Sequence, residues 1–336
     1  MTECKLQTPF LKWVGGKTQI IHKIIDKFPA EIENYHELFL GGGSVLFALL
    51  SLQQQNKIVV KNTIYAYDIN PILINVYKNI QTNKDNLFKY ITHYITKYDS
   101  IKKFNIDVVE PSNKSTDKTT SEYKQWKNSD EYKQWKRDIS IKRNPPTISI
   151  AVSSKESYYY WMRNKFNSIG KTSIECSALF MIMNKTGFRG MYREGPDGFN
   201  IPFGNYKTTP KIITKEELDT VSDLIKDVVF VSSDFINSIQ NIQEGDFVYL
   251  DPPYAPETEK SFVGYTADGF DLETHKKLFN EINILNEKNI KFVMSNAKVD
   301  LVVDTFNNFN CEEVKARRAI NSKKPGSTTT EVIIYN

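Results

Sequence analysis

Two long stretches of the chain, residues 9–98 and 210–336, alternate between strand-like and helix-like segments. Alternation of this kind predicts α/β units, in which helices cover the faces of a β-sheet. The residues between the two stretches differ, because 100–154 are polar and repetitive and 155–206 are aromatic and basic. The sequence therefore predicts one α/β sheet domain whose two halves are separated by an inserted region.

The composition is that of a soluble globular protein, with 40% hydrophobic and 25% charged residues. The formal net charge of +4 is compatible with a polyanionic partner but does not require one. Residues 1–13 lack the apolar segment of a secretory signal, and the longest apolar runs are too short to span a bilayer. We therefore expect a cytoplasmic protein that does not associate with membranes.

The cysteines and histidines form no pattern of metal ligands. Cys4, Cys176 and Cys311 are widely spaced, so they suggest neither a disulfide framework nor a zinc site. The four histidines contain no pair four residues apart and no cluster with a cysteine. We therefore expect reduced thiols, histidines that pack or face solvent, and no metal.

A short motif of one acidic, two proline and one aromatic residue follows an apolar, strand-like run at residues 247–250. The motif consists of Asp251, Pro252, Pro253 and Tyr254. Two proline rings fix two φ angles and donate no N–H groups, so the local carbonyl oxygens remain as acceptors.

Such a turn suits a flat ring that carries an exocyclic amino group. Asp251 and the Pro252 carbonyl would each accept one N–H, and Tyr254 would stack on the ring. The alternative is a turn that only ends the strand, since prolines are common in loops.

Two glycine-rich turns precede helix-like segments near the N-terminus. The first lies at residues 15–17, but Leu11 occupies the position of the first glycine in a phosphate-binding P-loop. The second lies at residues 41–44, but Leu46 occupies the position of the third glycine in a dinucleotide-binding motif. Because glycines let a ligand approach the backbone closely, a nucleoside ligand without a pyrophosphate remains open.

Two polar loops follow further strand-like segments. Asp68 ends residues 64–67 and is placed to hold ribose hydroxyls, and Asp234 and Phe235 follow 228–231 and suit an adenine amino group and ring edge. Ordinary loop chemistry explains each motif alone. The loops at residues 41–44, 68–70, 233–235 and 251–254, however, all follow predicted strands. The carboxyl ends of such strands are where open α/β sheets bind their ligands.

Together these motifs resemble those of the Dam-type DNA adenine-N6 methyltransferases. The resemblance covers nearly the whole chain except about residues 100–154. It comprises residues 10–17, 39–44, 68–70, 251–256 and 317–318, with a long central match at 184–193 and 199–207. It implies a Rossmann-like methyltransferase fold with a mostly parallel twisted sheet, a small and mainly helical target-recognition domain, and S-adenosyl-L-methionine as the cofactor.

The resemblance also implies roles for individual residues. The positions that match the family's cofactor site are Trp13, Lys17, Phe39, Gly41, Gly43, Ser44, Asp68, Asp234, Phe235 and Asp251. The positions on its DNA-contacting surface are Lys12, Phe188, Arg189, Met191, Arg193, Pro202, Asn205 and Tyr206.

Three of the DNA-contacting positions have a specific role in the family. Arg193 aligns with an arginine that reads a guanine, a contact that suits a bidentate guanidinium. Phe188 aligns with an aromatic side chain that wedges into the DNA stack, and Lys12 with a lysine that contacts the first guanine. Two positions depart from the pattern, since Arg189 stands where a relative carries Asn and Asn205 where it carries Arg. We expect GATC as the recognition sequence.

The predicted reaction is methyl transfer from S-adenosyl-L-methionine to the N6 amino group of an adenine flipped out of duplex DNA. A cytosine-C5 methyltransferase would need a nucleophilic cysteine after a proline, and none of the three cysteines follows one. The alternatives are an RNA methyltransferase and a catalytically silent DNA-binding protein. Residues 184–207 favour duplex DNA, and the intact cofactor loop and catalytic motif favour an enzyme. Double-stranded DNA is the expected partner, and a separately encoded restriction endonuclease is a further candidate.

The predicted boundaries are residues 1–99 and 208–336 for the catalytic domain, 100–154 for a flexible polar insertion, and 155–207 for the target-recognition domain. The insertion contains a duplication, because residues 122–127 and 131–136 both read EYKQWK. Its Trp and Lys side chains suit contact with nucleic acid, but an expansion without a role in the site is the simpler interpretation.

Overall fold

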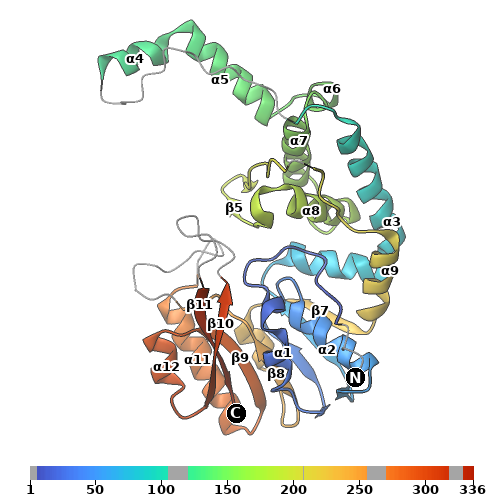
Figure 1. Cartoon of the computed structure of the whole chain (residues 1–336), viewed down its shortest axis with the longest axis vertical. Helices are drawn as coiled ribbons and strands as arrows, with labels where there is room; N and C mark the ends of the chain where they lie inside the picture. The colour runs from blue at the N-terminus through green and yellow to red at the C-terminus, as the bar shows by residue number, and fades with distance from the viewer. Residues whose placement is uncertain (1–5, 105–119, 207, 256–269, 318–327) are drawn as a thin grey trace. The chain divides into compact units, whose positions relative to one another are not determined.

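The computed structural model describes residues 6–104, 120–206, 208–255, 270–317 and 328–336 (Figure 1). The chain forms two compact units, one of residues 1–87 and 213–336 and the other of residues 88–212. The described part of the predicted insertion, including residues 120–151, belongs to the second unit together with residues 155–206. The functional division into catalytic, inserted and recognition domains stays a prediction.

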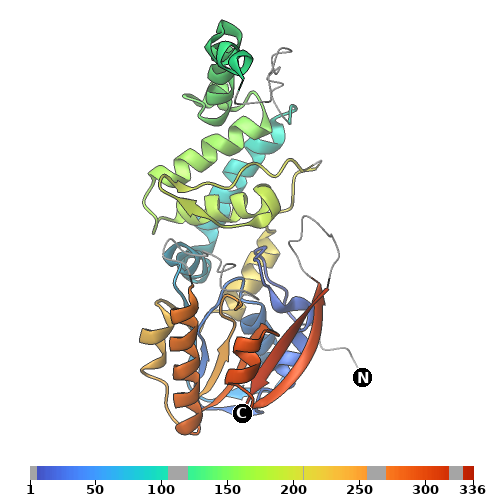
Figure 2. The same ribbon diagram turned by 90° about the vertical axis from the view of Figure 1, so that its left-hand side faces the viewer.

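The first unit is built around a seven-stranded sheet with the order β10-β11-β9-β8-β2-β4-β7. The strands are β2 (Tyr35–Glu37), β4 (Ile64–Asp68), β7 (Val228–Ser232), β8 (Phe247–Leu250), β9 (Lys291–Ala297), β10 (Asn310–Arg317) and β11 (Thr328–Tyr335). The five strands from β9 to β7 are parallel, whereas β11 is antiparallel to both β9 and β10. Figure 2 shows the β10–β11 pair at one edge of the sheet. This mostly parallel α/β architecture confirms the predicted fold class.

The strand order creates a switch point between β2 and β8. After β2 the chain adds β4 and then β7 on one side, and it later places β8 on the other side of β2. Loops that leave two such strands diverge, and the crevice between them is the general ligand site of open α/β sheets. The glycine loop at residues 41–44 follows β2, and the predicted catalytic turn at residues 251–254 follows β8.

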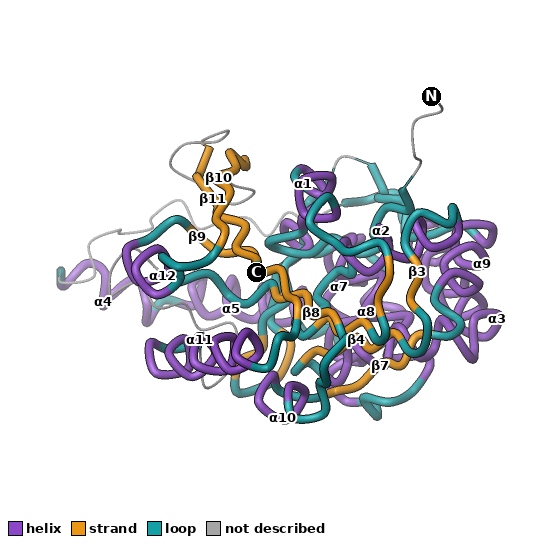
Figure 3. The backbone as a smooth tube through the Cα atoms, turned by 90° about the horizontal axis from the view of Figure 1, so that it is seen from below, coloured by secondary structure: helices purple, strands orange, loops and turns teal. Residues whose placement is uncertain are grey.

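Helices cover both faces of the sheet. They are η1 (Lys17–Gln19), α1 (Ile21–Ile25), α2 (Ser44–Gln54), α3 (Pro71–Ser100), α9 (Lys215–Leu224), α10 (Phe235–Ile239), α11 (Leu272–Glu287) and α12 (Asp300–Thr305). Helices α10 and α11 lie on one side of the strands, and α1 and α2 lie on the other (Figure 3). A small parallel pair, β1 (Glu31–Ile32) and β3 (Val59–Val60), completes the described secondary structure of this unit.

The centre of the sheet combines an apolar strand with a polar one. All four residues of β8 are buried, as expected for a parallel strand that is covered on both faces. The neighbouring β2 is also fully buried, although it contains His36 and Glu37. His36 Nε2 lies 3.1 Å from Asp246 Oδ2, and the Tyr35 hydroxyl donates to Glu37 Oε2 over 2.8 Å. These buried polar groups are therefore hydrogen-bonded, as their burial requires.

One core cluster lies between the sheet and α11. Val248 and Leu250 from β8 and Leu278 and Ile282 from α11 belong to it, and each is fully buried. Burial of each such side chain contributes about 1.5–3 kcal/mol. This packing holds α11 against the sheet.

The second unit is mainly helical in its described part. Its elements are α4 (Ser121–Asn128), α5 (Asp130–Arg143), α6 (Ile148–Ala151), α7 (Lys155–Ser168), α8 (Ile174–Thr186), η2 (Phe188–Gly190), β5 (Glu194–Gly195) and β6 (Gly198–Phe199), besides the end of α3. Hydroxyl side chains begin all five α-helices from α4 to α8: those of Thr120, Ser129, Thr147, Ser154 and Ser173 each accept a backbone N–H from the first turn.

The duplicated segments pack against each other. The Trp126 ring from the first copy lies edge-on to Tyr132 at 4.5 Å and is 6.1 Å from Trp135, both from the second copy. Trp126 is only 8% exposed as a result. The part of the insertion that the structure describes is thus helical. Among the described residues, no helix is both long and apolar enough to cross a membrane.

Candidate active site

The loops after β2, β4 and β8 hold the predicted cofactor and catalytic residues. These strands are neighbours in the sheet, so their carboxyl ends meet at one edge. Asp68 links two of the loops, because its Oδ2 accepts the Gly41 N–H over 2.9 Å. Its Oδ1 accepts the Asn70 N–H, also over 2.9 Å. Burial raises the pKa of Asp68, and these two hydrogen bonds oppose that shift.

Asp68 therefore has a local structural role that the sequence did not indicate. A carboxylate has about four acceptor positions, so two hydrogen bonds leave capacity for ligand hydroxyls. The predicted role of Asp68 in holding a ribose stays a prediction.

The glycine loop packs closely under Trp13. A Cβ atom on Gly41 would lie 2.8 Å from Trp13 Cδ1, and Gly41 has a φ of +50°, which disfavours other residues. Gly43, at φ +70°, is the residue that precedes α2. The backbone N–H of Lys17 donates to Ser44 Oγ over 3.1 Å. The structure thus brings together Trp13, Lys17 and the glycine loop, which the sequence predicted as parts of one cofactor site.

A buried ion pair joins the N-terminal turn to the catalytic turn. Lys17 Nζ lies 2.7 Å from Asp251 Oδ2, and the two side chains are only 3% and 19% exposed. The same ammonium group donates to the Gly15 carbonyl. Burial raises the pKa of Asp251 to about 6, although Lys17 lowers it and Glu331 adds a smaller upward effect.

The second carboxylate oxygen of Asp251 has a different environment. Within the described part of the chain, Asp251 Oδ1 is buried and accepts no hydrogen bond. A buried acceptor without a partner is unfavourable by about 1–3 kcal/mol, and more if it is charged. A donor from a ligand or from a bound water would satisfy this atom.

Tyr254 is held at its hydroxyl end. The hydroxyl donates to Glu331 Oε2 over 2.8 Å, and Lys17 Nζ lies 4.9 Å from the centre of the ring. Burial raises the pKa of this hydroxyl well above its ordinary value, and Asp251 and Glu331 raise it further. Tyr254 is therefore a neutral aromatic side chain in a fixed orientation. Its predicted stacking on a flipped base stays a prediction.

Aromatic residues form a wall beside the loops. The Phe39 ring lies 5.9 Å from Phe235 and 6.2 Å from Phe270. The carboxylate of Asp234 begins α10, since it accepts the backbone N–H of Asn237 over 2.9 Å. Phe39 and Phe235 are therefore neighbours, and their predicted contacts with the cofactor stay predictions. Asp234 has a capping role in addition to its predicted contact with the cofactor.

Three residues that support the catalytic turn were not identified from the sequence. Glu331 on β11 holds Tyr254, and Asn296 on β9 accepts the Ala255 N–H over 3.1 Å. His275 on α11 lies 3.1 Å from the Pro253 carbonyl oxygen through its Nε2 atom. These residues come from strands and a helix that follow the motif, and no local spacing pattern marks them.

Glu37 is a fourth residue near this site that was not identified from the sequence, and it is buried. Burial raises its pKa to about 8, with the Tyr35 hydroxyl lowering it and Asp251 raising it. Glu37 is therefore mainly uncharged at neutral pH, which limits its repulsion of Asp251.

The predicted DNA-contacting residues, apart from Lys12, lie in the second unit. Phe188 is 42% exposed, and Arg189, at φ +55°, places its guanidinium 5.2 Å from the Phe188 ring. The exposed Arg193 donates from Nε to Asn200 Oδ1 over 2.7 Å. Tyr206 donates to the Gly187 carbonyl over 3.1 Å.

The remaining predicted DNA-contacting residues are half-buried or exposed. Met191 and Tyr206 are half-buried, Pro202 and Asn205 are exposed, and Lys12 in the first unit is exposed. The Pro202 carbonyl accepts the Phe188 N–H over 2.9 Å, which ties the two halves of the predicted recognition segment together.

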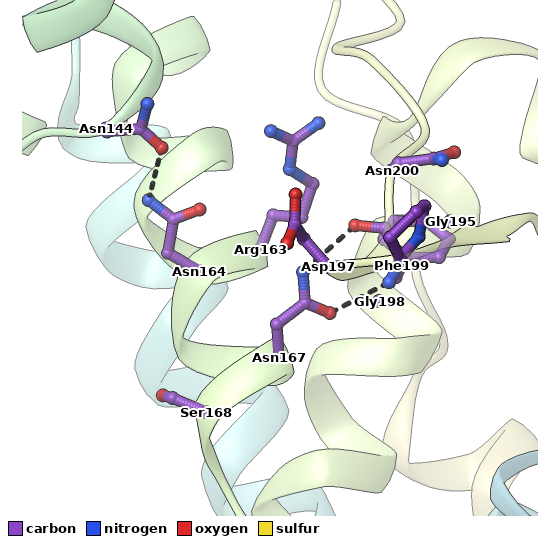
Figure 4. Close-up of a pocket in the computed structure, with 11 residues that line it drawn as sticks. Asn144, Arg163, Asn164, Asn167, Ser168, Gly195, Asp197, Gly198, Phe199 and Asn200 are labelled. Carbon is purple, nitrogen blue, oxygen red and sulfur yellow. Dashed lines mark hydrogen bonds between the residues drawn. The ribbon is translucent and has the colours of Figure 1, made fainter.

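A polar pocket of about 510 Å³ lies between α7 and the β5–β6 hairpin (Figure 4). Asn167 from α7 donates to the Phe199 carbonyl over 3.0 Å and accepts the Phe199 N–H over 3.0 Å. Its amide thus satisfies both backbone groups of Phe199, as the backbone of a paired strand would. Arg163 donates to the Ile201 carbonyl over 3.3 Å. Asn167 and Arg163, which line the pocket, thus hold the segment that carries Arg193.

Comparison with known proteins identifies the family. Residues 13–128 and 141–320 match the model of the D12 class N6 adenine-specific DNA methyltransferases. The type II methyltransferase M.MjaIII of Methanocaldococcus jannaschii is 31% identical, over 98% of each chain. The DNA adenine methylase of Haemophilus influenzae is 27% identical over 93% of this chain and 87% of its own. The type II methyltransferase M.CviBI of Paramecium bursaria Chlorella virus NC1A is 26% identical over 98% of this chain and 99% of its own. These matches confirm the predicted resemblance, and the chain belongs to the D12 class N6 adenine-specific DNA methyltransferases.

Proposed function

We propose that this methyltransferase uses S-adenosyl-L-methionine to methylate the N6 atom of a flipped adenine within GATC in double-stranded DNA. The observation that carries the proposal is the buried Asp251 Oδ1 atom, which has no hydrogen-bond partner among the described residues. The target amino group is a donor of the kind that this atom lacks. Its position in the turn after β8, beside the switch point, supports the assignment.

The residues of the first unit also suit the cofactor. The glycine loop has positive φ angles at Gly41 and Gly43, and Trp13 packs directly against it. Asp68 keeps unused acceptor positions, and Phe39 and Phe235 offer an aromatic wall. We propose that these residues hold the nucleoside part, with Lys17 and Ser44 beside them. When bound, S-adenosyl-L-methionine supplies a methyl group that its sulfonium makes electrophilic.

Asp251 and the Pro252 carbonyl then hold the adenine amino group. Two acceptors favour a tetrahedral nitrogen, so its lone pair leaves conjugation with the ring and forms the new N–C bond as the S–C bond breaks. The methylated nitrogen must lose one proton. Asp251 is suited to receive it, because a pKa of about 6 makes it a stronger base than an ordinary aspartate. Tyr254 would stack on the flipped ring.

The second unit supplies target recognition in this proposal. Arg193 lies on the exposed segment that Asn167 and Arg163 hold, and its Nε atom donates to Asn200. Within the described part of the chain, its two terminal nitrogens make no hydrogen bond. A guanidinium of this kind suits the paired acceptors of a guanine edge. Because relatives are named type II methyltransferases, we also propose that a separately encoded restriction endonuclease acts at the same sequence.

Methylation of plasmid DNA tests the proposal. Purified protein and S-adenosyl-L-methionine should produce N6-methyladenine, and sequencing that detects this base should find it at GATC. The Asp251→Ala variant, prepared in parallel, should produce none. Methylation at another sequence would contradict GATC alone, whereas no methylated adenine in any plasmid would contradict the proposed reaction.

A further inference from the structure

The sequence of the catalytic turn restricts most of the backbone torsions between Asp251 and Tyr254. The rings of Pro252 and Pro253 fix their φ angles. Asp251 and Pro252 each precede a proline, which confines their ψ angles to extended values. The first ψ angle without such a restriction is that of Pro253, and it sets the direction of the Pro253 carbonyl and of the following residue, Tyr254.

His275 holds that carbonyl. Its Nε2 atom lies 3.1 Å from the Pro253 oxygen, and its Nδ1 atom lies 2.9 Å from the Asp271 carbonyl oxygen, one turn earlier in the chain. The side chain is 1% exposed, so no competing hydrogen bond to bulk water is available. Both neighbours are carbonyl oxygens, which can only accept, and a neutral imidazole carries one N–H, so it donates to one of them. The hydrogen bond to Pro253 forms in the tautomer that carries the proton on Nε2.

The imidazole is itself fixed on its other sides. The Phe270 ring lies edge-on to it at 4.6 Å, and Phe279 lies 6.0 Å away. Phe270 also contacts Phe235 and Phe39 at 5.9 and 6.2 Å. His275 thus connects the catalytic turn with the aromatic wall of the proposed cofactor site.

We propose that His275 is a positioning residue for catalysis, which fixes the ψ angle of Pro253 and thereby orients Tyr254 toward the target base. The proposal rests on the function proposed above. The other end of Tyr254 is fixed by Glu331, and Ala255 by Asn296. His275 constrains the Pro253 carbonyl, which neither these contacts nor the proline rings hold in place.

Two substitutions distinguish the effect of the His275 hydrogen bond from the effect of its packing. His275→Leu keeps a buried side chain of similar size but removes the donor, whereas His275→Gln retains an amide N–H at similar reach. Ile282→Val on the same helix is a matched control, because it disturbs the buried face of α11 without touching the turn.

The kinetic outcome should distinguish these variants. We expect His275→Leu to lower kcat by about 10- to 100-fold, in line with small displacements of reacting groups, with little change in KM for DNA. His275→Gln should recover most of the loss, and Ile282→Val should match the parent. Equal kcat values for parent and His275→Leu, or equal losses in the Leu and Gln variants, would overturn the positioning role.

A second measurement does not depend on adenine methylation. Hydrogen exchange of the peptide that covers residues 250–255 should be faster in His275→Leu than in parent and Ile282→Val, because the Ala255 N–H lies in the released turn. Unchanged exchange there would refute the inference even in an active enzyme. If the parent methylates no adenine but exchange rises as expected, the proposed function fails and the restraint by His275 stands.

Discussion

The active-site region and the recognition segment handle charge in opposite ways. At the switch point, Lys17 and Asp251 are buried and already paired. In the predicted recognition segment, Arg193 is exposed and donates to the neutral side chain of Asn200. The first arrangement is completed during folding, so its geometry exists before substrate arrives. The second leaves the cation exposed to solvent, where it is available to an anionic partner. If the proposed roles hold, the catalytic groups are preorganised and the recognition groups are adaptable.

Substitution of Asp251 should have the largest effect. Asp251→Ala removes the buried acceptor and should lower kcat by about 10³-fold or more, because both charge stabilisation and proton acceptance are lost. Single-turnover methylation of a GATC duplex measures this loss.

Asp304→Ala, on the exposed side of α12, is the control and should be fully active. Activity of Asp251→Ala within a few-fold of the parent would contradict the catalytic role of Asp251. The contrast between a preorganised site and an adaptable surface would then fail.

Arg193→Ala should have the next largest effect. A base-reading arginine contributes about 1–3 kcal/mol at one base pair, so the variant should lose preference at a single position of GATC. Methylation rates on GATC and its single-base variants provide the measurement.

Arg137→Ala on α5 removes the same charge from another exposed position and should leave the preference intact. A uniform loss on all duplexes, with a lower salt dependence, would instead identify Arg193 as a phosphate contact.

The pH dependence of kcat/KM should report the ion pair of Lys17 and Asp251. The pKa of Asp251 is raised to about 6, so the charged acceptor disappears as the pH falls through that value. We expect kcat/KM, which reports the free enzyme, to decline on the acidic side with an apparent pKa near 6. Lys17→Met removes the cation that lowers this pKa and should move the acidic limb to higher pH.

Lys23→Met on the exposed face of α1 should leave the limb in place. A limb that stays unchanged in Lys17→Met would mean that the ion pair does not control the titration of Asp251.

Removal of most of the duplicated segment should have the smallest effect. A short Gly/Ser linker in place of residues 120–138 should leave methylation of a short duplex within about twofold, as for other surface changes. The same variant should unfold at the parent's temperature. A loss of sequence preference would show that recognition extends beyond the segment around Arg193.

The sequence predicted the parts of the active site whose signals are local. Strand-like runs that end in acidic or glycine-rich turns located Asp68, the glycine loop and the catalytic turn, because the end of a strand is a local feature. Their convergence followed from the rule that ligands bind at the carboxyl ends of parallel strands.

The partners of these residues were not predicted. The pairing of Lys17 with Asp251, and of Tyr254 with Glu331, depends on which strands become neighbours, and strand order is a property of the whole fold. The buried Glu37 was also missed, because a charged residue in a short strand resembles a solvent-facing position until both faces of the sheet are covered. The roles predicted for the individual site residues stay predictions.

The duplicated hexapeptide has a consequence for solubility. A single copy with one Tyr and one Trp would expose apolar surface, which favours aggregation. Here the second copy covers the first, since Tyr132 and Trp135 pack on Trp126. The repeat therefore supplies its own packing partner, and Trp126 is kept from solvent without help from the central sheet.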